Sequence, residues 1–338
     1  MSSEALSLMN SFSHVYVERN ILHHPRTERI LSFFPNAEVI VIERYKDIFD
    51  RSRQNYDLQF LSQKLILAEK TGTFIYEGSK ACEDFGNEWF YYCTNALNCI
   101  FNCEYCWLKG MYSSANPVVF VNLEDFFAET EKLLQQHPVY LCLSYETDLV
   151  PFENMTGMLQ EWGEFTVNHP DLSVEIRTKS ALEIWDRIPA NDRIIPSFTL
   201  SPDPVIERYE HKTPSLSRRL SAAEQAVDQG FKVRLSFDPM FSVSNWQKIY
   251  AEMIEKTMQV LQPDNIRDIN IGTFRLSKEY MRLMRKRFPD SAVVQYPYVL
   301  KDGFYQYPQE KKDRMEEYVS GVLGKYVEKE KIFRLEEK

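Results

Sequence analysis

Six short apolar segments alternate with amphipathic segments through the middle of the chain, and this alternation restricts the fold more than any other feature. The apolar segments predict strands within residues 89–93, 139–144, 172–178, 193–201, 231–237 and 266–272. The segments between them predict helices over 122–136, 153–168, 217–229 and 246–261, with a short one near Ala181. Because parallel strands need long crossover connections, strands joined through helices indicate a parallel sheet. Six such units predict an α/β fold, a partial (β/α)6 barrel of the TIM type, with its chemistry at the C-terminal strand ends.

Two smaller units are expected to flank this barrel, which we place at residues 86–290. Residues 1–85 contain apolar strands at 14–18 and 37–43 and a helix at 25–34, which indicate a small α/β unit. Residues 291–338 contain Asp302-Gly303 between two aromatic-rich runs, followed by a charged tail. That pattern predicts a β-hairpin and a C-terminal helix.

The composition is ordinary for a soluble globular protein, with 44% hydrophobic and 26% charged residues. No stretch approaches the roughly 20 apolar residues that cross a bilayer, and the first residues lack the pattern of a secretory signal. We therefore expect a cytoplasmic protein without a membrane partner, and a monomer. The formal net charge of −9 argues against a generally basic nucleic-acid-binding surface, although it leaves room for a local positive groove.

Three cysteines lie on one predicted loop, in the sequence Cys99-Ile-Phe-Asn-Cys103-Glu-Tyr-Cys106. Thiols clustered in this way indicate metal binding rather than disulfides. Three thiolates can hold three irons of a 4Fe-4S cluster and leave the fourth iron open to a small-molecule ligand. The alternative is a zinc-binding structural module, with Cys93 as a fourth ligand. No second cysteine pair follows downstream, so the spacing favours the cluster.

The tract CIFNCEYCWLKGMY, at residues 99–112, resembles the radical S-adenosylmethionine motif and, more closely, the cluster loop of spore photoproduct lyase. The segments VFVNLEDF, SYETDLVPFEN, IRTKS and FTLSPDPVIERYEHKTPSLSRRLSAA are also similar to that family. The resemblance covers nearly the whole chain. Two segments, GMYSSA and YLCLSYETDL, resemble a clostridial-like branch of the family.

The resemblance implies a DNA repair lyase that reverts the spore photoproduct, a methylene-bridged thymine dimer, to two thymines. It implies two cofactors, a 4Fe-4S cluster and S-adenosylmethionine, which together yield a 5′-deoxyadenosyl radical. It also implies DNA and a reductant such as flavodoxin or ferredoxin as partners. A radical S-adenosylmethionine enzyme of the same lineage that acts on another nucleotide or a small molecule is the alternative, favoured by the acidic net charge.

The resemblance further assigns four residues to the cofactor. Thr147, Lys179 and Thr199, at the ends of the second, third and fourth barrel strands, match the family's contacts with the methionine end of S-adenosylmethionine. Lys179 would offer the carboxylate a cation, and a solvent-facing lysine is the alternative. Tyr105 matches a tyrosine linked to cofactor packing and hydrogen return, and shielding of the cluster is the alternative.

The usual hydrogen-donor cysteine of the family is replaced by Tyr145. Cys142 lies three residues upstream, on the opposite face of the strand, and is expected to be a core residue. The clostridial-like branch takes its donor thiol from the segment before the cluster loop, which makes Cys82 the candidate; an ordinary loop cysteine is the alternative. Because Trp107 stands where the family often has tyrosine, Tyr145 or Tyr105 would have to relay hydrogen back to the cofactor.

The predicted C-terminal hairpin is the candidate contact with DNA. A lesion inside a duplex has to leave the base stack before a radical reaches it, which an aromatic or apolar wedge with flanking cations promotes. The hairpin supplies Tyr296, Tyr298 and Tyr305 as aromatic residues and Lys301 as a cation. Packing of the aromatic residues on the protein's own barrel is the alternative.

Overall fold

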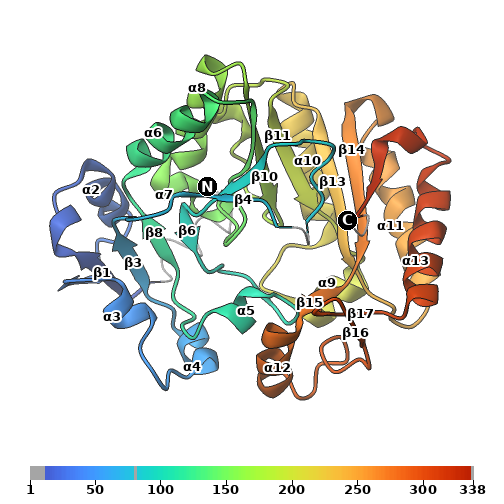
Figure 1. Ribbon diagram of the computed structural model, residues 1–338, viewed down its shortest axis with the longest axis horizontal. Helices are drawn as coiled ribbons and strands as arrows, with labels where there is room; N and C mark the ends of the chain where they lie inside the picture. The colour runs from blue at the N-terminus through green and yellow to red at the C-terminus, as the bar shows by residue number, and fades with distance from the viewer. Residues whose placement is uncertain (1–11, 80–81, 336–338) are drawn as a thin grey trace.

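The computed structural model describes residues 12–79 and 82–335 of the chain (Figure 1). Its central sheet has eight strands in the order β18-β14-β13-β11-β10-β9-β5-β4. The six predicted strands are all present and parallel, which confirms the partial barrel. They are β5 (Phe90–Cys93), β9 (Val139–Cys142), β10 (Leu172–Thr178), β11 (Ile194–Thr199), β13 (Val233–Met240) and β14 (Ile266–Thr273). Two short strands that the sequence did not reveal, β4 (Ile75–Glu77) and β18 (Ile332–Arg334), form the edges.

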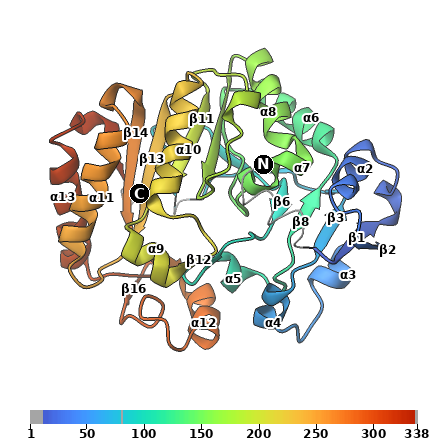
Figure 2. The ribbon, with the colours of Figure 1, turned by 180° about the vertical axis from the view of Figure 1, so that it is seen from behind.

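Amphipathic helices cover the outer face of this sheet, as Figure 2 shows for α8 and α10. They include α6 (Leu123–Leu134), α8 (Met158–Asn168), α10 (Leu216–Asp228) and α11 (Trp246–Val260). The predicted helix over 153–168 is two helices, because Gly157 adopts a left-handed conformation with φ 69° between α7 (Glu153–Thr156) and α8. The prediction of a helix near Ala181 is wrong. The Thr178 and Ser180 hydroxyls accept hydrogen bonds from the backbone amides two residues further along the chain, and such bonds compete with a helix.

The N-terminal unit forms a second sheet, in the order β2-β1-β3-β8-β6. Strands β1 (His14–Glu18), β2 (Glu38–Ile42) and β3 (Leu65–Ala68) are parallel, and α2 (Pro25–Ser32) connects the first two. The other strands come from either side of the cysteine loop: β6 (Ala96–Leu97) precedes it and β8 (Val118–Phe120) follows it. The N-terminal unit therefore holds both ends of the loop.

The C-terminal segment contains the predicted hairpin. Strands β16 (Val299–Lys301) and β17 (Phe304–Gln306) are antiparallel and are joined by Asp302 and Gly303, which both have positive φ. Strand β15 (Arg275–Ser277) adds a third strand, and α12 (Lys278–Arg287) follows it. Helix α13 (Gln309–Leu323) then packs against α11 and β14. In the described part of the chain, no helix is both long and apolar enough to span a membrane.

The inner face of the barrel is polar. The strand register places Arg177, Ser197, Arg234 and Asp268 side by side across β10, β11, β13 and β14. The next row toward the C-terminal strand ends consists of Thr199, Ser236 and Asn270. Because side chains alternate along a strand, the residues next to these inward-facing ones point toward the helices, and buried apolar side chains occupy these positions: Ile176, Phe198, Leu235 and Ile269. The apolar core therefore lies outside the sheet and leaves the interior to hydrogen-bonding groups.

Candidate active site

The cysteine loop is tied to the C-terminal end of the barrel by a two-stranded sheet. Strand β7 (Asn102–Cys103) pairs antiparallel with β12 (Glu210–His211), so that Cys103 lies opposite Glu210. A further bond, from the Glu104 amide to the Tyr209 carbonyl (2.8 Å), extends the pairing. Strand β12 follows β11 after the short helix α9 (Asp203–Tyr209). The loop is therefore anchored beside the ends of the barrel strands, where the sequence predicted the chemistry.

The three thiols of the loop are free and suit a cluster. Cys103 is buried, while Cys99 and Cys106 are half-buried. Burial raises the pKa of Cys103 to about 12, and burial also raises the pKa of Cys99, with Cys106 adding to both shifts by its charge. The Phe101 amide donates a hydrogen bond to the Cys99 sulfur (3.4 Å), a contact typical of cluster ligands. Among the described residues, no three His, Cys, Asp or Glu side chains are placed to hold a single metal ion.

Tyr105 belongs to a buried network that sequence reasoning missed. Its hydroxyl donates to Glu210, which also accepts a bond from the Ser201 hydroxyl (2.8 Å) and pairs with Arg219. Arg219 is completely buried and donates further bonds to the Thr199 carbonyl and the Pro214 carbonyl, both at 3.0 Å. The charge of Arg219 holds the pKa of Glu210 at about 2 against the effect of burial. This network links the cluster loop to the end of β11.

We expect Arg219→Met to lower the free energy of unfolding by about 3–5 kcal/mol, because it leaves the Glu210 carboxylate buried without its cation. The double variant Arg219→Met/Glu210→Leu should lose less, since both charges are then removed. Urea unfolding of the purified protein measures both values. A single variant as stable as the wild type would show that the pair does not stabilise the loop.

The predicted cofactor residues gather at the strand ends. The Lys179 ammonium group lies 5.8 Å from the centre of the Tyr105 ring, so these two residues are brought together. Thr199 is the buried last residue of β11, and Thr147 is buried in the segment that follows β9. Asp148, the residue after Thr147, accepts bonds from the Thr178 hydroxyl (2.8 Å) and the Lys179 amide (2.7 Å). Burial raises the pKa of Asp148 to about 6.

Cys82 and Tyr145 are adjacent although they are far apart in the sequence. The Cys82 thiol donates to the Tyr145 hydroxyl over 3.8 Å. The Tyr145 ring stacks on Tyr92 (centroids 4.1 Å apart) and contacts Trp107 (5.4 Å), the residue after the last loop cysteine. Cys142 is buried in β9. The structure thus connects Cys82 to the cysteine loop through two aromatic side chains.

The aromatic residues of the hairpin fall into two groups. Tyr298 is buried, donates to the Val293 carbonyl (2.7 Å) and packs against Tyr296 and Tyr307. Tyr296 accepts a bond from the Lys311 ammonium (2.9 Å), and Tyr305 lies under the Arg285 guanidinium, 4.9 Å from its carbon. Lys301 is exposed at the tip. Tyr298 therefore follows the alternative prediction, in which an aromatic residue of this segment packs on the protein itself rather than against DNA.

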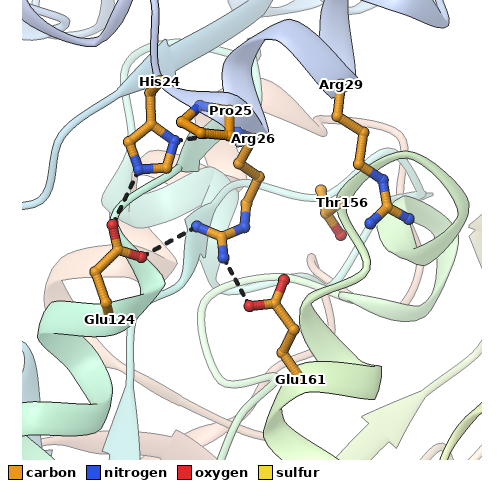
Figure 3. Close-up of a pocket in the computed structure, with 7 residues that line it drawn as sticks. All are labelled: His24, Pro25, Arg26, Arg29, Glu124, Thr156 and Glu161. Carbon is orange, nitrogen blue, oxygen red and sulfur yellow. Dashed lines mark hydrogen bonds and ion pairs between the residues drawn. The ribbon is translucent and has the colours of Figure 1, made fainter.

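A separate open pocket of about 380 Å³ lies between α2 and the helices α6 to α8 (Figure 3). Arg26 lies inside it and pairs with Glu161 (2.7 Å) and Glu124 (3.3 Å), and His24 also bonds Glu124 (3.0 Å). None of the predicted site residues lines this pocket. These ion pairs join the N-terminal unit to the barrel helices.

Comparison with known proteins identifies the family. The family model described as spore photoproduct lyase matches residues 11–335, nearly the whole chain. The chain belongs to the spore photoproduct lyase family. A curated spore photoproduct lyase from Clostridium acetobutylicum is 25% identical over 91% of this chain and 93% of its own length. That of Bacillus subtilis is 22% identical over 81% of this chain and 82% of its own.

Solved structures of spore photoproduct lyase share the fold. One, in complex with dinucleoside spore photoproduct, has a TM-score of 0.81 at 18% identity and covers 96% of this chain and 98% of that chain. A mutant with bound AdoMet and the same dinucleoside also has a TM-score of 0.81, at 19% identity. The match covers 97% of this chain and 100% of that chain. The predicted family and fold class are confirmed.

Proposed function

We propose that this chain is a radical S-adenosylmethionine lyase that reverts the spore photoproduct to two thymines. The observation that carries the proposal is the anchoring of three free cysteines beside the strand ends of a spore photoproduct lyase fold, next to Tyr145 and Cys82. Cys99, Cys103 and Cys106 would hold a 4Fe-4S cluster, and Lys179, Thr147, Thr199 and Tyr105 would bind S-adenosylmethionine. When bound, these cofactors supply a 5′-deoxyadenosyl radical.

The protein's own residues would complete the reaction. Cys82 would give its thiol hydrogen to the carbon radical of the product: the S–H bond breaks, the C–H bond forms and a thiyl radical remains on sulfur. The Tyr145 hydroxyl, 3.8 Å away, would then return a hydrogen atom to that sulfur: its O–H bond breaks, the S–H bond forms again and the radical passes to the tyrosine oxygen, from which the relay back to the cofactor would continue. Tyr92 and Trp107 pack against the Tyr145 ring, and burial raises the pKa of Tyr145.

The test of the function is product analysis with the dinucleoside photoproduct. Protein loaded with iron and sulfide under anaerobic conditions is reduced and incubated with S-adenosylmethionine and the photoproduct. Thymidine as the product, formed in step with photoproduct loss, supports the proposal. Formation of 5′-deoxyadenosine without thymidine would favour an enzyme of the same lineage with another substrate. We also propose a cytoplasmic monomer reduced by flavodoxin or ferredoxin.

We propose further that the hairpin contacts duplex DNA, through its tip rather than through Tyr298. Leu300 and Phe304 expose 47% and 37% of their surface there, next to Lys301. Exposed apolar side chains of this kind can wedge between base steps, and cations beside them meet phosphates.

The double variant Leu300→Ser/Phe304→Ser is expected to bind photoproduct-containing duplex about 10-fold more weakly, since a stacking contact contributes roughly 1–3 kcal/mol. Turnover of the free dinucleoside should be unchanged, because it needs no wedge. The matched control is Val39→Ser, an exposed apolar residue on the N-terminal sheet. Equal losses with the dinucleoside and with duplex would contradict a role in DNA binding.

A further inference from the structure

Three arginines on the inner side of the barrel are each paired with a carboxylate. Arg177 bonds Glu175 through Nε (3.2 Å) and Nη2 (2.9 Å). Arg234 donates to Asp268 through Nη2 (2.8 Å) and through Nε. Arg275 makes a bidentate contact with Asp238, from Nη1 to Oδ1 and from Nη2 to Oδ2, both at 2.9 Å. The three cations and the three anions cancel.

This balance restricts what the barrel interior can accept. A phosphate or carboxylate placed there would meet as many negative as positive groups, and its desolvation would go uncompensated. An apolar ligand would leave the polar rows of β11, β13 and β14 without partners. An uncharged ligand rich in hydrogen-bonding groups satisfies both conditions, and a pyrimidine base with its carbonyl and imide groups is such a ligand.

Arg177 has spare hydrogen-bonding capacity toward the interior. Its side chain is 27% exposed, although the neighbouring Ile176 on the helix-facing side of β10 is fully buried, so solvent reaches Arg177 from inside the barrel. Within the described residues, its Nη1 donates no hydrogen bond, because the contact with Glu175 uses only Nε and Nη2. A guanidinium fixed on one side by a carboxylate is a rigid donor for a carbonyl oxygen on the other.

The position of Arg177 is close to the proposed donor thiol. Burial raises the pKa of the Cys82 thiol, and the positive charge of Arg177 is the largest effect that opposes the rise. The strand register puts Tyr92 opposite Cys142 and Cys142 opposite Glu175, so Tyr92 lies on the inner face with the Glu175–Arg177 pair. Tyr145 stacks on Tyr92 and accepts the bond from the Cys82 thiol, which places the thiol on the same side of the sheet. A base that accepts a bond from Arg177 therefore lies beside Cys82.

Ser236 supplies a second, independent observation. It is completely buried in β13, and its hydroxyl has no hydrogen-bond partner among the described residues. In the strand register it lies between Thr199 and Asn270, on the row above Arg177. A buried hydroxyl without a partner is costly, and a hydrogen-bonding group of a ligand inside the barrel would satisfy it.

We propose that Arg177 and Ser236 hydrogen-bond the uncharged carbonyl and imide edge of the lesion base inside the barrel and so hold the base against Cys82. Both are positioning and specificity residues for the proposed reaction, and the inference rests on that proposed function. The backbone phosphates of DNA stay outside the barrel in this arrangement.

The test is equilibrium binding of the dinucleoside photoproduct, which carries no phosphate, to cluster-loaded protein with S-adenosylmethionine. Arg177→Lys keeps a cation beside Glu175 but loses the planar guanidinium group with its several N–H donors, and we expect Kd to rise about 10-fold or more. Ser236→Ala removes only the hydroxyl, and we expect a rise of about 3- to 10-fold. Arg187→Gln, which changes an arginine outside the barrel, is the control and should leave Kd unchanged.

Two further readouts separate the outcomes. Affinity for S-adenosylmethionine and iron content should stay at the wild-type level in both variants, and raising the salt concentration should barely change Kd, because the ligand site carries no net charge. Unchanged photoproduct affinity in both variants would overturn the proposal, as would a loss confined to S-adenosylmethionine binding or a strong salt dependence. If the wild-type protein itself neither binds nor converts the photoproduct, it is the proposed function that fails.

Discussion

Cys103→Ala is expected to abolish photoproduct cleavage and to reduce the iron content of the anaerobically loaded protein. Cys103 is the buried cysteine of the loop and lies in the β7–β12 pairing that anchors it. A cluster held by only two thiolates lacks a ligand for one iron and falls apart readily. Iron and sulfide analysis, the absorbance of the cluster and thymidine formation measure the effect together.

Cys93 and Cys142 provide the matched controls for that experiment. Both are buried cysteines outside the loop, so alanine removes the same thiol from a buried position in each control. Cys93→Ala and Cys142→Ala should retain iron and activity. Loss of iron from Cys93→Ala as well, with zinc in the purified wild type, would point to a four-cysteine metal site and contradict the proposal.

Cys82→Ala should still cleave the lesion but divert most of the product away from thymine. Without the thiol, the carbon radical left after bridge cleavage has no nearby weak X–H bond and reacts with solvent species or reductant instead. Chromatography and mass spectrometry of the products separate thymidine from radical-trapped adducts. Consumption of the photoproduct should stay close to the wild-type rate.

The neighbouring residues sharpen this experiment. Cys142→Ala should give normal thymine product, because the thiol that donates to the Tyr145 hydroxyl is that of Cys82, while Cys142 is buried in β9. Tyr145→Phe keeps the thiol but removes the hydroxyl beside it, so the first turnover should succeed and more S-adenosylmethionine should be consumed for each repair event. Normal repair by Cys82→Ala would refute the assignment of the donor.

Local sequence patterns were enough to predict the barrel. Each of the six strands overlaps its predicted range, although β13 and β14 extend past theirs to Met240 and Thr273. The prediction succeeds because each strand is a continuous apolar or alternating run bounded by helical segments. The edge strands β4 and β18 were not predicted, because three residues are too few to show an alternation of apolar and polar side chains. The break at Gly157 depends on a glycine that a helix pattern otherwise tolerates.

The cysteine spacing on one loop by itself determined the kind of cofactor to expect, because ligand type and local spacing are properties of a short segment. Only the tertiary structure decided which distant residues meet. It brought Cys82 to Tyr145, closed the network of Tyr105, Glu210 and Arg219, and balanced the charges inside the barrel. Such contacts arise from strand register and loop packing between segments up to about a hundred residues apart, which no periodicity within one segment encodes.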